Sequence, residues 1–288
     1  MGWSLQNFAL LIALSASQLT GCARWKDSVT NENQASKAAA AIGTVKESKN
    51  RVVVEVEFVN RIIDESESNK DLWQWVDETA IDSRVRQKLI SNGIRSGFVS
   101  SEDRFRDHLK PADTTHDVVE TFLAEASIAS DVAHGSKRIP MRFGKRVELP
   151  LGQPIEGSHV AMLRVDGETV GQTLPNAQYL FALTATQADS ANQIRLKIRP
   201  EIQYGETKQK WVSSDTALRI DSRRETWSLP ELDLNLVASE QDLIVLAPTR
   251  PLKGLAKRML SGTGSDQENE ELYVLLRIVQ IPSAVDQL

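Results

Sequence analysis

The stretch HVAMLRVDGET, residues 159–169, decides the fold class because it holds the strongest hairpin signal in the chain. Asp166-Gly167 is a dipeptide that favours the tight turn between two antiparallel strands. From residue 136 onward, apolar side chains recur at every second position, which is the period of a strand with one buried face. Further strands are expected over Tyr179–Thr186, Gln193–Tyr204, Thr226–Val237, Asp242–Leu246 and Glu271–Ile281.

The region before this β-rich half predicts a strand and short helices. RVVVEVEFV, Arg51–Val59, alternates in the manner of a strand. A helix is expected to begin at Ser68, with Asp71 completing a capping box and with an apolar stripe formed by Leu72, Trp73 and Val76. Further expected elements are a helix from Asp82 to Asn92-Gly93, a short strand over Ile94–Val99, a helix around Phe105–Leu109 and a helix over Thr114–Asp131. Helices that come first and strands that follow predict an α+β fold with a mostly antiparallel β-rich half.

The N-terminus reads as an export signal. Residues 1–21 contain no Asp, Glu, Lys or Arg, and Phe8–Ala16 has the length of a secretory apolar core, which is too short to cross a bilayer. Leu19-Thr20-Gly21-Cys22 resembles the lipobox of bacterial lipoproteins, and the resemblance implies that Cys22 is acylated and becomes the new N-terminus. The alternative is an inert, buried cysteine.

The cysteine count and the chain's organisation fit this resemblance. Cys22 is the only cysteine, and a protein exported to an oxidising compartment then carries no other thiol to mispair. We expect a signal peptide over 1–21, a polar tether over 22–50, a mixed region over 51–135 and a β-rich region over 136–288. Residues 51–288 could also form one domain. The alanine after Cys22 favours, by resemblance to lipoproteins, the outer over the inner membrane, facing the periplasm.

Two clusters are candidate partner-binding residues. The formal charge of −5 argues against nucleic acid as a partner, yet five cations lie in ten residues: Lys137, Arg138, Arg142, Lys145 and Arg146. This strip could bind an anionic glycan, a lipid headgroup or an envelope protein, or it could be a solvated strand face. Trp73 and Trp75 cannot both face one core on a helix, so one could touch a partner. The alternative is that both serve only packing.

Catalytic and metal-binding patterns are missing from the sequence. His108 and His116 lie eight residues apart with no HExxH motif, and His159 has no GxSxG elbow to supply a nucleophile. We therefore predict no enzyme, no metal and no cofactor. An exported hydrolase stays a third alternative, which would require His159 or His116 to meet a nucleophile or a carboxylate.

A looser resemblance covers residues 51–281. RVVVEVEFV, the segment Asn176–Tyr204 with Pro200-Glu201-Ile202, and the pair Glu240–Leu246 with Glu271–Ile281 are similar to the core module of the outer-membrane secretins. The resemblance implies a soluble relative of that module.

Together these features predict a non-enzymatic, lipid-anchored envelope protein that binds or scaffolds envelope or secretion components. The alternative is a lipoprotein that holds a glycan or a small apolar ligand against Trp73, Trp75 or Trp211.

Overall fold

A computed structural model describes residues 51–62, 70–109, 136–190, 192–213, 218–261 and 270–282. All of them belong to one compact unit, Lys49–Leu288. Several expectations fall outside the described residues: the signal peptide, Cys22, the tether over 22–50, the helix start at Ser68, the helix over Thr114–Asp131, and His116. Among the described helices, none is long and apolar enough to cross a membrane.

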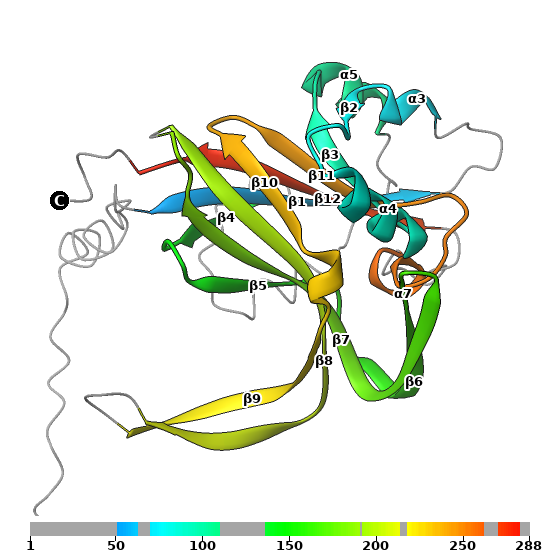
Figure 1. Cartoon of the computed structure of the whole chain (residues 1–288), viewed down its shortest axis with the longest axis vertical. Coiled ribbons are helices and arrows are strands. Elements are labelled where there is room, and N and C mark those ends of the chain that lie inside the picture. Colours follow the sequence, from blue (N-terminus) through cyan, green and yellow to red (C-terminus); the bar gives the residue numbers. More distant parts are fainter. Residues whose placement is uncertain are drawn as a thin grey trace, which may run out of the picture. The chain divides into compact units, whose positions relative to one another are not determined.

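The first sheet has six strands in the order β2-β3-β11-β12-β1-β4, and every neighbouring pair is antiparallel (Figure 1). Its strands are β1 (Val52–Ile62), β2 (Val76–Asp77), β3 (Ile94–Val99), β4 (Ser136–Met141), β11 (Leu243–Pro248) and β12 (Glu270–Gln280). The first sheet therefore combines three strands from the region 51–135 with three strands from the region 136–288.

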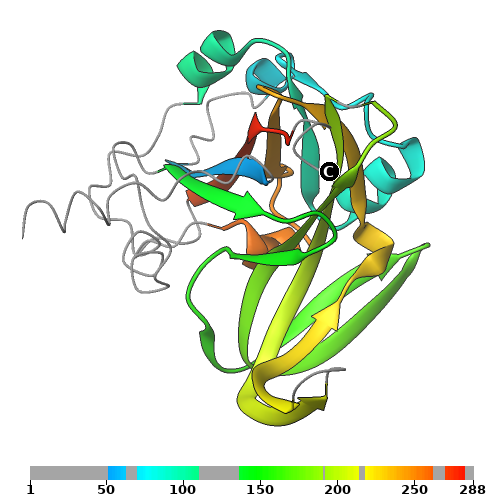
Figure 2. The same cartoon turned by 90° about the vertical axis from the view of Figure 1, so that its left-hand side faces the viewer.

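The second sheet is built on two unusually long strands. It has the order β10-β8-β7-β5, formed by β5 (Arg146–Pro150), β7 (Glu168–Gln187), β8 (Gln193–Ser213) and β10 (Leu234–Ser239). The first part of β7 leaves the sheet to pair with β6 (Ile155–Val165), and the last part of β8 leaves it to pair with β9 (Leu218–Ser228). Figures 1 and 2 show the two resulting hairpins extending from the same side of the sheet pair.

The helices are short: α3 (Lys70–Trp73), α4 (Ser83–Ser91), α5 (Glu102–His108), α7 (Ala256–Met259) and the 3₁₀ turn η2 (Pro230–Leu232). α4 begins as the sequence predicts, because the Asp82 carboxylate accepts hydrogen bonds from the backbone N–H groups of Arg84 and Val85 at 3.0 and 3.2 Å. It ends before Gly93, whose φ of +83° suits glycine.

The alternating side chains of β1 build two separate cores. Val52, Val54 and Val56 are fully buried between the two sheets, in a core shared with β7, β8 and β10. Val59 lies on the opposite face, in a second core formed by that face, α3 and α5. Phe105 of α5 is fully buried there. The first sheet is therefore covered on both faces. The second sheet covers its inner face, and the short helices α3 and α5 cover part of its outer face.

The structure confirms the fold class: mostly antiparallel β-sheet with a few short helices. The hairpin turn is also confirmed, because Asp166 and Gly167 have φ angles of +51° and +91° and connect β6 to β7.

Two element predictions are wrong. The helix expected through residue 76 stops at Trp73, because Val76 pairs with Val99 in β2. The strand expected over Thr226–Val237 is interrupted by η2, which begins at a proline without an N–H group.

Candidate partner-binding surfaces

The basic strip predicted from sequence is divided between two sheets. Arg138 lies on β4 and is half exposed, 3.7 Å from Glu55 on the outer face of the first sheet. Arg142 and Lys145 lie exposed in the turn that follows. Arg146 begins β5 in the second sheet, where it forms ion pairs with Glu148 and Glu201. The four residues therefore do not form one continuous strip.

Lys137, the fifth cation of the strip, points the other way. It pairs with Val56 in the strand register, so it projects toward the core between the sheets, and only 5% of its surface is exposed. Its ammonium group is buried without a hydrogen-bond partner, and this burial lowers the pKa of Lys137. Lys137 therefore contributes no charge to a binding surface.

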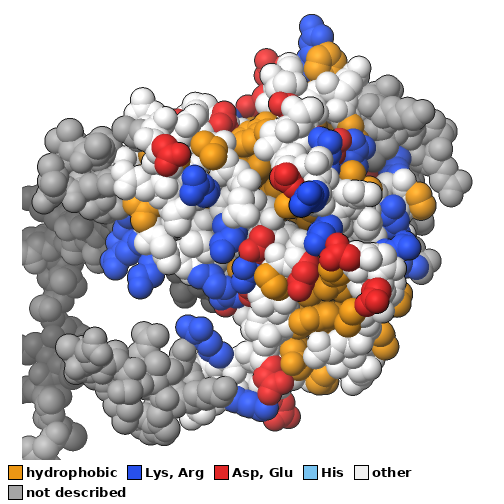
Figure 3. Space-filling view, in the orientation of Figure 1, with side chains coloured by type: hydrophobic (Ala, Val, Ile, Leu, Met, Phe, Trp, Pro, Cys, Tyr) orange, Lys and Arg blue, Asp and Glu red, His pale blue; other side chains and the backbone are white. Residues whose placement is uncertain are grey.

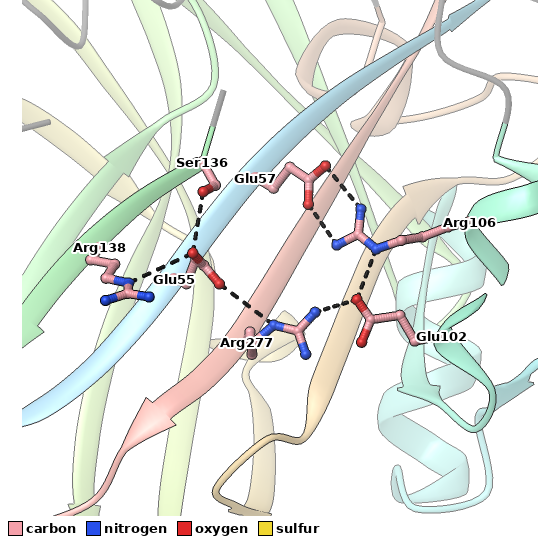
Figure 4. A network of polar contacts seen from close by, with 7 residues as sticks. All are labelled: Glu55, Glu57, Glu102, Arg106, Ser136, Arg138 and Arg277. Carbon is pink, nitrogen blue, oxygen red and sulfur yellow. Dashed lines mark hydrogen bonds and ion pairs between the residues drawn. The ribbon is translucent and has the colours of Figure 1, made fainter. Parts of the chain in front are cut away.

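A network of charges fixes α5 on the outer face of the first sheet (Figure 4). Arg106 of α5 donates hydrogen bonds to Glu57 of β1 and, within its helix, to Glu102. Arg277 of β12 contacts both Glu102 and Glu55. The hydrogen bond from Arg277 is the main cause that lowers the pKa of Glu102. These groups satisfy one another, so the network holds the helix in place and leaves little free charge.

Trp73 and Trp75 pack against the same second core, contrary to the expectation that they would face apart. The helix ends at Trp73, so the helical spacing on which that expectation rested does not apply. Trp73 is 6% exposed and Trp75 is half-buried. The guanidinium of Arg95 lies 3.9 Å from the centre of the Trp73 ring, and that of Arg104 lies 4.8 Å from the centre of the Trp75 ring. A stacked sugar would have to displace these groups.

The polar ends of the two rings are unusual. Neither indole N–H has a hydrogen-bond partner, although both nitrogens are buried. The side chain of Trp211 is outside the described residues, so the third predicted ligand contact stays a prediction.

His159 meets a tyrosine. Its Nε2 lies 2.9 Å from the hydroxyl of Tyr179 across the β6–β7 pair. Burial raises the pKa of Tyr179 to about 12, and burial followed by the charge of Arg258 lowers the pKa of His159. The pair is therefore a neutral hydrogen bond near pH 7.

His108 contacts the backbone carbonyl of Arg104 at 2.7 Å. Within the described ranges, no three His, Cys, Asp or Glu side chains are grouped to hold a metal ion.

Sequence reasoning missed the β8–β9 ribbon, residues 204–213 paired with 218–225. Beyond Gln203, the only strand that pairs with β8 in the described part of the chain is β9, and β9 pairs with no other strand. At the base of the ribbon lies a hollow of about 480 Å³ with a polar lining that includes Arg146, Glu148, Gln203 and Arg224. The length of the polar segment that follows Tyr204 is the signal that could have indicated this ribbon.

No protein-family model, no curated protein and no solved structure matches this chain.

Proposed function

We propose that this chain is a lipid-anchored envelope protein, attached through acylated Cys22, whose β-rich domain binds or scaffolds other envelope or secretion components. The observation that carries the proposal is the β8–β9 ribbon. An isolated two-stranded ribbon is at best marginally stable in water. Among the described strands, none pairs with either outer edge of this ribbon, so each edge offers backbone N–H and C=O groups to a further strand. Such an edge can accept a strand from a partner by β-augmentation.

The ribbon also has a composition that suits a protein partner. Lys208 pairs directly with Arg223 in the register, and the Lys208 ammonium contacts Glu225 at 2.5 Å. Charged side chains on an open edge keep the ribbon from pairing indiscriminately, and a complementary partner strand would neutralise them.

The anchor is tested by intact-mass spectrometry of the protein purified from membranes of its native host. A mature chain that starts at Cys22 with added acyl mass, lost in Cys22→Ala, supports the anchor. A full-length chain without acyl mass contradicts it.

Partner binding is tested by photocrosslinking in the same membranes. A photoreactive residue at Gln209, exposed on the ribbon, should give discrete crosslinked products. The matched control is the same residue at Gln87, exposed on α4. The same products from both positions, or none from Gln209, would contradict a binding role for the ribbon.

A further inference from the structure

The chain enters the described domain beside a group of cations. Val52, the first residue of β1, pairs with Met141, the last residue of β4, and Arg142 follows directly. The turn that starts at Arg142 is fixed against the second sheet, because the backbone N–H of Gly144 donates to the carbonyl of Ala185 at 2.8 Å. The segment preceding residue 51 is therefore attached next to the end of β7.

The strand register brings further cations to this place. Arg146 of β5 pairs with Thr184 of β7, and Thr184 pairs with Lys197 of β8. Thr186 pairs in the same way with Arg195. Residues directly opposite one another in neighbouring strands project from the same side of a sheet, so these positions share its outer face. Together with the turn they form a surface that we call the basic face: Arg142, Lys145, Arg146, Arg195 and Lys197.

Much of this charge is uncompensated. Arg146 is paired with Glu148 and Glu201, and Lys197 lies 3.9 Å from Asp233. Arg142, Lys145 and Arg195 are exposed, and within the described ranges they form no ion pair. Figure 3 shows Lys and Arg side chains gathered on the side of the molecule that carries β4, β5 and the outer face of the second sheet. The chain as a whole has a formal charge of −5, so this group of exposed cations is a local exception that attracts anions.

We propose that the basic face docks on the anionic lipid headgroups of the membrane that holds Cys22, an inference that rests on the anchor proposed above. The 29 residues from Cys22 to Asn50 are the length of chain between the anchor and the domain. A random coil of that length has a root-mean-square span of about 30 Å. The basic face lies where this segment joins the domain, so the lipid surface is the nearest extended anion. One lipid anchor and one basic patch are the two signals that together hold a protein firmly on a membrane.

Lysine footprinting tests the proposal on the protein purified from the membranes of its native host. The protein is mixed with excess vesicles of phosphatidylcholine alone, or of equimolar phosphatidylcholine and phosphatidylglycerol, and the acetylation rate of each lysine is followed by mass spectrometry. Lys145 should react several-fold more slowly on the anionic vesicles, and high salt should restore its rate. Lys257, exposed on α7, is the internal control and should react equally on both.

Variants connect the protection to the face. Arg142→Gln/Arg195→Gln should weaken protection of Lys145 by roughly 25-fold in lipid concentration, at about five-fold per cation removed. The matched control, Arg84→Gln/Lys253→Gln, removes two exposed cations elsewhere and should leave protection unchanged. Inorganic phosphate added to neutral vesicles should give no protection, which distinguishes a lipid surface from a free phosphate site.

Each failure has a separate meaning. Equal acetylation rates for Lys145 on both kinds of vesicle overturn the docking proposal. If Lys145 is then protected when the same acetylation is carried out in native membranes, the basic face is assigned to an acidic protein instead. Protection by phosphate alone overturns it too. An unacylated chain whose Lys145 is still protected contradicts the anchor but keeps the basic face, whereas an acylated chain without protection keeps the anchor and rejects the face.

Discussion

Arg106 donates one hydrogen bond to each carboxylate oxygen of Glu57, at 3.0 and 2.8 Å, across 49 positions of sequence. The two groups are partly exposed, at 37% and 23%. This bidentate pair connects α5 to the central part of the first sheet, where the helix covers the second core. The contact therefore stabilises a helix of seven residues that is too short to be stable alone.

A double-mutant cycle on Arg106→Ala and Glu57→Ala should give a coupling free energy of about 1 kcal/mol, because the pair is bidentate but partly solvated. The free energy of unfolding from urea titration measures it. Arg84→Ala, which removes an exposed arginine of α4, should change stability by less than about 0.5 kcal/mol. A coupling indistinguishable from zero would show that α5 is held by apolar contacts alone.

Glu102 should make stability depend on pH. Arg277 lowers the pKa of Glu102 below its ordinary value of 4.5, so the carboxylate contributes stability that is present above that value and is lost as the pH falls through the lowered pKa. Glu102→Gln should therefore lower the free energy of unfolding by about 1 kcal/mol at neutral pH and by less near about pH 3. Glu168→Gln, at an exposed position, is the control. A difference that does not shrink in acid would contradict the prediction.

Lys137→Met should stabilise the protein. The substitution keeps a long, unbranched side chain and removes a buried ammonium group that has no partner, which should add about 1 kcal/mol to the free energy of unfolding. The pKa of Lys137 is lowered in the folded chain, so the unfolded chain holds this proton more tightly. The free energy of unfolding of the wild type should therefore increase as the pH rises through the lowered pKa, and Lys137→Met should not show this increase. Thermal unfolding of Lys137→Met beside the exposed Lys145→Met measures both effects. A lower melting temperature for Lys137→Met would show that the ammonium group is satisfied in solution.

Gly97→Ala should be strongly destabilising, although its backbone is an ordinary strand. A Cβ atom at Gly97 would lie 2.6 Å from both the Asp77 carbonyl oxygen and Val76 Cγ1, so β2 would have to move away. We expect a loss of about 2 kcal/mol or more. Gly171→Ala is the matched control, because its Cβ would lie 3.6 Å from the nearest atom, and alanine there should be neutral or slightly stabilising. Equal effects in urea titration would show that β2 is not tightly held.

The elements that sequence reasoning identified correctly are those set by local chemistry. The Asp82 cap, the Asp166-Gly167 turn and the alternation of β1 each depend on neighbouring residues only. The conformation after Trp73 could not be predicted in this way. It depends on the pairing of Val76 with Val99, a contact between residues far apart in sequence. That pairing turns two tryptophans expected to face apart toward one core.

The basic face, too, was predictable only where it depends on residues close together in sequence. Arg142, Lys145 and Arg146 could be selected from their spacing alone. The opposite directions of Lys137 and Arg138 follow from strand alternation, but which of them faces the core depends on the strand register with β1. Arg195 and Lys197 join the basic face only through the pairing of β7 with β8. Sequence proximity therefore identified part of the face and included two residues that do not belong to it, Lys137 and Arg138.

The position of β12 has a consequence for synthesis. β12 is the last described strand along the chain, yet it lies between β1, the first strand, and β11 in the middle of the first sheet. Val54 of β1 pairs with Ile278 of β12, so this edge of β1 stays unpaired until Ile278 has been synthesised. The nascent domain therefore cannot complete either core by stepwise addition, and a chain terminated before Glu270 would lose a central strand, so the domain should stay incompletely folded until β12 has been synthesised.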